Sequence, residues 1–228
     1  MLGLVNGLSG WAVLAFVLAY LSALLVAMSF HEFAHAFVAT KQGDPTPKAY
    51  KRLTLKAFNH VDALGFISLL IFHFGWAKPV PVNPLNFKHR KSGEFFVSIA
   101  GILTNLILAF AFSGIYILLF VNYKPWFVSN NFYAMLLSNF LEISIIINIS
   151  LAIFNLLPIY PLDGFRIVET FSGPNSGFSQ FMKQYSFIIL IILLISGLTS
   201  AIIGFVGDYV ISGFLNFWLW VASGFKAI

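Results

Sequence analysis

Three residues with the spacing of a metal site interrupt an apolar stretch near the N-terminus. His31, Glu32 and His35 lie within LLVAMSFHEFAHAFVAT, residues 24–40. On a helix, residues four apart lie on one face, so both imidazoles reach a single ion while Glu32 faces its bound water. This His-Glu-x-x-His arrangement predicts two zinc ligands and a general base that takes a proton as water attacks a carbonyl. A charge near the middle of a bilayer costs about 2.5–3.5 kcal/mol, which a simple anchor helix has no reason to carry.

A third ligand must come from elsewhere, because a catalytic zinc takes three protein ligands and leaves one position open. The chain has no cysteine, so the ligand is a histidine or a carboxylate. The candidates are His60, Asp62, His73, His89, Glu142 and Asp163. Asp163 fits best, since NLLPIYPLDGFR ends an apolar segment and Gly164 allows a turn that points the carboxylate inward. The alternative for Asp163 is a cap on the next helix.

The composition is that of an integral membrane protein. Of the 228 residues, 59% are hydrophobic and 9% are charged, against about 25% charged in soluble domains. The net charge of +5 comes from basic residues between apolar segments. That pattern orients membrane proteins and does not indicate nucleic-acid binding.

The apolar segments predict an all-α polytopic fold with about four to six transmembrane helices. Segments 11–39, 95–121, 132–158 and 185–206 are expected to span, and 209–225 either spans or lies at the surface. Segment 63–77 is short and lies between two basic loops, so we expect it to be re-entrant. The whole chain, 1–228, is expected to be one membrane domain with a core of about 11–206.

Loop charges predict where the candidate ligands lie. If both basic loops are cytoplasmic, the first helix runs inward and 132–158 returns inward. His31 and Asp163 then lie at similar depth, nearer the cytoplasm. Two further stretches, KRLTLKAF at 51–58 and AKPVPVNP at 77–84, read as extended chain. We expect them to form a small β element at the membrane surface, with an edge that holds unwound substrate by strand addition.

Four blocks in this order resemble the site-2 protease family of intramembrane zinc metalloproteases. They are HEFAHAF, FGWAKPVPVNP, SIAGILTNLILA and FNLLPIYPLDGFRI, within about residues 20–185. The resemblance is to a short form without an appended PDZ domain. It implies one Zn²⁺ per chain, bound by His31, His35 and Asp163, with Glu32 as the base. It also implies that Asn155, eight residues before the aspartate, positions the substrate or the oxyanion.

The resemblance has departures and leaves some roles open. The chain reads Ala-Gly-Ile at 100–102 and Asp-Gly-Phe at 163–165, where family members commonly read AGP and LDGG. These changes remove neither a ligand nor the base. Asn105, in GILTNL, is either a residue near the site or a packing contact between helices.

The expected function is hydrolysis of peptide bonds in or near transmembrane segments of membrane proteins. The implied partners are a transmembrane substrate and the lipid bilayer, and no nucleic acid. We expect a bacterial or archaeal cytoplasmic membrane as the location. The alternative is a metal-ion transporter or sensor that uses the same cluster, although transporters typically show internal repeats, which the sequence lacks.

Overall fold

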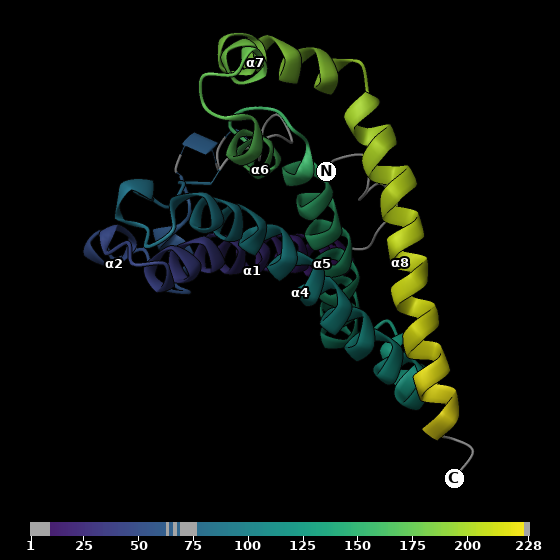
Figure 1. The fold of residues 1–228 in the computed structure, drawn as a ribbon. Coiled ribbons are helices and arrows are strands. Elements are labelled where there is room, and N and C mark those ends of the chain that lie inside the picture. Colours follow the sequence, from purple (N-terminus) through teal and green to yellow (C-terminus); the bar gives the residue numbers. More distant parts are fainter. Residues whose placement is uncertain (1–9, 63, 66–67, 69–76, 226–228) are drawn as a thin grey trace.

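The computed structural model describes residues 10–62, 64–65, 68 and 77–225. Seven helices of four or more residues, together with two short 3-10 turns, make up the regular structure of this part of the chain (Figure 1). In chain order they are α1 (Gly10–Lys41), α2 (Thr46–Ala49), η1 (Ala57–Asn59), η2 (Pro84–Asn86), α4 (Arg90–Phe127), α5 (Phe132–Leu156), α6 (Asp163–Ser172), α7 (Gly177–Ile195) and α8 (Leu198–Phe225).

The predicted all-α polytopic fold is confirmed. Among the described residues, five helices are long and apolar enough to cross a membrane: α1, α4, α5, α7 and α8. The last two divide differently from the expected segments 185–206 and 209–225. The break falls at Gly197, whose φ of +72° suits a residue without a side chain, and α8 continues unbroken through Asp208. The whole stretch 198–225 is therefore one helix.

Three helices, α1, α4 and α5, pack against one another and form the core of the molecule. Small residues at every fourth position of α1 make this close packing possible. Ala15, Ala19, Ala23 and Ala27 have no exposed surface. The same face of the helix continues into the two histidines of the His-Glu-x-x-His motif.

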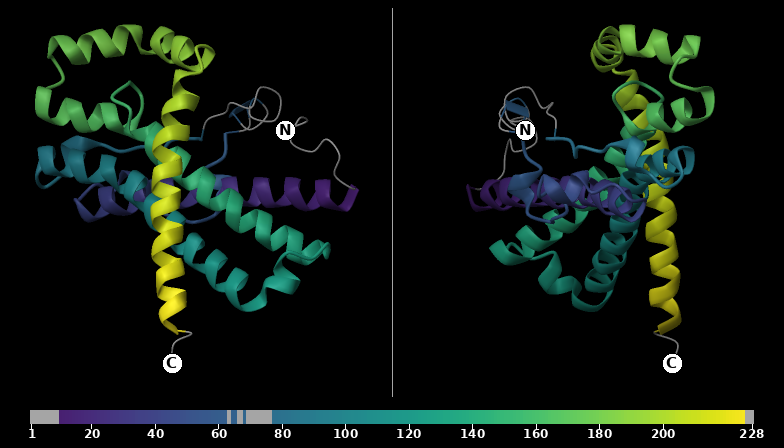
Figure 2. Two further views of the ribbon diagram at one scale, coloured as in Figure 1. Left: turned by 90° about the vertical axis from the view of Figure 1, so that its right-hand side faces the viewer. Right: turned by 60° about the vertical axis from the view of Figure 1, so that its left-hand side comes forward.

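The remaining long helices lie outside this core. In Figure 1, α7 lies beside α6 at one end of the molecule, and α8 follows the outer side of α4 and α5. Figure 2 shows α8 running steeply across the direction of α1. Most of the surface of α7 and α8 is exposed, which suits helices that face lipid.

The expected small β element is not present as strands within the described residues. The β pairing that these residues do form is one isolated antiparallel bridge between Val61 and Ala77. The stretch 51–58 contains a turn, a bend and the start of a 3-10 turn, while 78–83 has no regular secondary structure. Most of the segment expected to be re-entrant, 63–77, lies outside the described residues.

Candidate metal centre and active site

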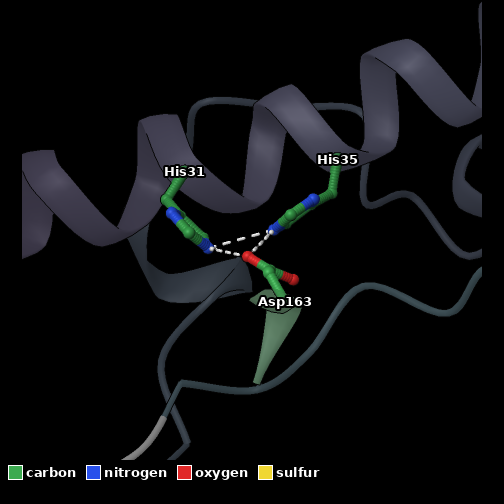
Figure 3. A group of neighbouring side chains, drawn as sticks. All are labelled: His31, His35 and Asp163. Atoms are coloured by element: carbon green, nitrogen blue, oxygen red, sulfur yellow. Dashed lines mark hydrogen bonds and ion pairs between the residues drawn. The ribbon is translucent and has the colours of Figure 1, made fainter. Parts of the chain in front are cut away.

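The structure brings together two residues of α1 and the first residue of α6. His31 Nε2 and His35 Nε2 lie 3.0 Å apart. Asp163 Oδ2 lies 3.2 Å from each of them. Figure 3 shows both rings directed at the carboxylate, so one oxygen and two nitrogens face a common point. Segments 132 residues apart in sequence, at His31 and Asp163, are thus in contact.

The donor set and its spacing fit a zinc ion. With zinc–ligand bonds of about 2.0 Å, the edges of a tetrahedron are about 3.3 Å long, close to the separations found here. Asp163 Oδ2 is buried and receives no hydrogen bond of good geometry, as expected of an atom whose partner is a cation. Both histidines are buried, at 7% and 8% exposure. The chemistry and the geometry therefore suit a three-ligand zinc site with one open position.

The charge state of Asp163 is also suited to a cation. Burial by itself raises the pKa of this carboxyl, but the adjacent His35 and His31 side chains, in their protonated form, outweigh it and hold the pKa below its ordinary value. Asp163 is therefore a carboxylate at neutral pH, and a cation binds once the Nε2 atoms of the two histidines are deprotonated.

Two glycines allow backbones to come close to this cluster. A Cβ on Gly101 of α4 would lie 2.6 Å from the Nε2 atoms of both histidines. A Cβ on Gly164 would collide with the backbone carbonyls of Leu156 and Leu157 at the end of α5. Gly101 thus lets α4 pass beside the ion site, and Gly164 lets α6 start against α5 with Asp163 directed inward.

Second hydrogen bonds fix the orientation of both imidazoles. His35 Nδ1 donates to the backbone carbonyl of Val97 at 2.7 Å. His31 Nδ1 donates to Asn105 Oδ1 at 2.6 Å. With the proton on Nδ1, each Nε2 presents its lone pair to the ion, which is the usual arrangement for histidine ligands.

Asn105 is the site residue that the sequence left open. It is fully buried, and its Nδ2 donates to Asn148 Oδ1 at 2.7 Å and to the carbonyl of Ala27 at 3.3 Å. Those two bonds leave Oδ1 as the acceptor for His31. The sequence contains one indication of this role: Asn105 follows Gly101 by one helical turn in a largely apolar segment.

Glu32 lies beside the cluster and outside the donor set. Its Oε2 accepts a hydrogen bond of 2.9 Å from the backbone N–H of Val80, in segment 78–83. Asn155 lies in the last turn of α5, where its Nδ2 donates to the carbonyl of Leu151 at 3.0 Å. Within the described residues it makes no hydrogen bond to the cluster.

The other candidate ligands lie away from the three donors. His60 is buried, but its Nε2 donates to a backbone carbonyl of its own loop at 2.7 Å. Asp62 accepts from the N–H of Gly65 at 2.9 Å. Glu142 and His89 are exposed, and His73 lies outside the described residues.

Comparisons with known proteins agree with this site. The sequence profile of Peptidase family M50 matches residues 19–197. A Bacillus subtilis (strain 168) protein named "Putative zinc metalloprotease YwhC" is 41% identical over 181 residues, which cover 79% of this chain and 81% of that protein. "Putative zinc metalloprotease Rip2" of Mycolicibacterium smegmatis (strain ATCC 700084 / mc(2)155) is 28% identical over 177 residues, covering 75% of this chain and 64% of the relative. No solved structure gives a significant match.

The family match includes both halves of the metal cluster, since it starts before His31 and ends after Asp163. The similarity to the Bacillus protein extends over most of both chains. The helices of the core are long and apolar enough to span a membrane. The chain therefore belongs to peptidase family M50, the site-2 proteases, and is a zinc metalloendopeptidase embedded in a membrane.

Proposed function

We propose that this protease hydrolyses peptide bonds in or near the transmembrane segments of other membrane proteins. The observation that carries the proposal is the position of the cluster. His31 and His35 lie on the buried face of a 32-residue apolar helix, and Asp163 reaches them from just beyond the end of another spanning helix. A site built within the membrane bundle acts most readily on substrates that are themselves in the membrane.

Each residue has a defined task in this proposal. His31, His35 and Asp163 would hold the zinc. When bound there, it would supply a Lewis acid for the scissile carbonyl and a lowered pKa for the attacking water. Glu32 takes the proton of that water and passes it to the leaving amine nitrogen. Asn155 donates its second amide N–H, the one not bonded to Leu151, to the carbonyl oxygen of the substrate.

The cell side of the site follows from the loop charges. The stretch 41–56, from the last residue of α1 onward, holds five basic residues, and 78–91, up to the first residues of α4, holds four. Under the positive-inside rule both face the cytoplasm, and the metal cluster lies nearer that side of the cell membrane. Substrate therefore enters from the bilayer, and its cleaved end has a short path to the cytoplasm.

The first experiment separates the protease from a metal transporter. Glu32→Gln keeps all three ligands, so it should bind zinc normally and lose about 10²- to 10⁴-fold in cleavage of a co-reconstituted transmembrane substrate. His31→Ala should lose both zinc and cleavage. Glu142→Gln, which changes an exposed glutamate on α5, is the matched control and should behave as the parent.

Transport makes the opposite prediction. A parent protein that moves zinc across proteoliposomes, cleaves no membrane substrate and keeps its flux in Glu32→Gln would reject the proposal. Cleavage of soluble peptides at rates equal to those of membrane substrates would reject the substrate class alone.

A further inference from the structure

One peptide group connects a buried arginine to the proposed base. The N–H of Val80 donates to Glu32 Oε2 at 2.9 Å. The carbonyl of Pro79, in the same peptide group, accepts from Arg52 Nη2 at 3.0 Å. Both ends of the Pro79–Val80 amide are therefore bonded, one to a guanidinium and the other to the carboxylate.

The local sequence makes Val80 the donor at this place. Pro79 and Pro81 have no backbone N–H, so Val80 carries the single donor of the Pro-Val-Pro tripeptide. This donor is bonded to Glu32. Because the Val80 N–H is bonded to Oε2 of Glu32, the other oxygen, Oε1, is left to take the proton of the attacking water.

Arg52 is held tightly enough to position this segment. Its exposure is 6%, and no carboxylate within the described part of the chain lies in ion-pair distance of it. A buried cation without a carboxylate partner is costly unless its N–H groups are satisfied. The carbonyls of Lys78 and Pro79 both accept from its Nη2 at 3.0 Å. The positive charge also polarises the amide, which makes the N–H of Val80 a stronger donor.

The far end of the segment has its own attachment. Asp44 is fully buried just beyond α1, and its Oδ2 accepts from the N–H of Asn83 at 2.7 Å. Its Oδ1 accepts from Asn86 Nδ2 at 2.8 Å. Segment 78–83 is thus fixed near both ends, and Arg52 is the attachment next to Glu32.

We propose that Arg52 is a positioning residue for the catalytic glutamate, acting through the Pro79–Val80 peptide group. This inference rests on the proposed role of Glu32 as the base. It assigns to Arg52 the placement of the carboxylate, with no contact to zinc or substrate.

The test compares five single variants and one double variant of the full chain, purified in detergent or reconstituted with a transmembrane substrate. Val80→Pro removes the donor, and Val80→Ala keeps it. Arg52→Gln removes the charge, and Arg52→Lys keeps it. Lys56→Gln, an exposed lysine of the same loop, controls for the loss of one charge. The measurements are kcat, KM, bound zinc, thermal unfolding and hydrogen exchange of the Val80 amide.

Val80→Pro and Arg52→Gln should each lower kcat about 10- to 100-fold, the effect of one hydrogen bond to a charged group, with KM and zinc unchanged. Lys56→Gln should match the parent, Val80→Ala should lose far less activity than Val80→Pro because it keeps the N–H, and Arg52→Lys should recover part of the loss. The double variant Arg52→Gln/Val80→Pro should be no slower than the slower single variant, because both remove the same contact. The Val80 amide should exchange faster in both Arg52 variants.

Three results would overturn the proposal: parental kcat in Val80→Pro, multiplying losses in the double variant, or zinc loss in proportion to activity. If Arg52→Gln does not fold, Val80→Pro and the exchange of Val80 in Arg52→Lys decide the question. Activity in Glu32→Gln would refute the base itself. An inactive Glu32→Gln beside a fully active Val80→Pro would refute only the role of Arg52.

Discussion

The passage of α4 beside the metal cluster makes Gly101 a sharp test of the site. In Gly101→Ala the new Cβ would lie 2.6 Å from His31 Nε2 and from His35 Nε2. Ordinary contacts start near 3.4 Å, so the two nitrogens must move away by the difference, 0.8 Å. A metal site tolerates about 0.2 Å in its ligand distances. The displacement is four times that tolerance, so we expect zinc binding and cleavage to be lost together.

Gly101→Ala should lower the free energy of unfolding only modestly, although it abolishes zinc binding and cleavage. Added volume in a packed core typically destabilises by about 1–3 kcal/mol. The assay is zinc content by mass spectrometry, beside thermal unfolding of the metal-free protein and cleavage of a membrane substrate. Gly101→Ala should remain folded in the metal-free state while failing to retain zinc after dialysis.

Gly114→Ala is the matched control. It lies on the same helix, about 20 Å further along at 1.5 Å per residue. Its new Cβ would come equally close, 2.6 Å, to a ring atom of Trp218 on α8. Stability should fall by a similar amount, but zinc should stay bound. Stoichiometric zinc in Gly101→Ala, or equal zinc loss in both variants, would refute the geometry described here.

Three further outcomes follow from the site and its supports. Asn105→Ala removes the acceptor for His31 Nδ1, so zinc affinity should fall about 10- to 100-fold in a chelator competition, while Ser113→Ala, which changes another buried polar residue of α4, should leave it unchanged. Burial raises the pKa of Asp44, but hydrogen bonds from Thr46 and the 83–86 segment outweigh this effect and lower the pKa below its ordinary value. Its stabilising effect is therefore present above about pH 4 and lost as pH falls through the folded pKa, and Asp44→Asn should flatten that part of the unfolding profile. Removing the metal with a chelator should abolish cleavage, and added zinc should restore it.

Much of the fold could be read from the sequence because a membrane core imposes strong length and polarity rules. Long apolar runs specify spanning helices, and α1, α4 and α5 follow the expected segments closely. The boundary between α7 and α8 was misplaced. Gly207 and Asp208 look like a break, but a helix tolerates one glycine and one exposed carboxylate, and the positive φ is at Gly197.

The prediction of a small β element was wrong for a reason unrelated to the boundary between α7 and α8. The alternation in 51–58 predicts a strand, but a strand needs a partner that its own sequence does not specify. In the structure, Arg52 of this stretch is a buried side chain that bonds to the carbonyls of 78–79. The two stretches do meet, through a side chain and not through a backbone ladder.

The sequence by itself determined the chemistry of this protein. The spacing of His31 and His35 on one helix face, with Glu32 between them, is local and needs no tertiary information. Tertiary structure alone decided which groups support that chemistry. The Asn105 amide and the Gly101 backbone reach the two histidines from α4, and the Val80 N–H reaches Glu32 from a segment 48 residues along the chain. Such contacts depend on how the helices pack against one another, and patterns of residues that are close in sequence do not specify that packing.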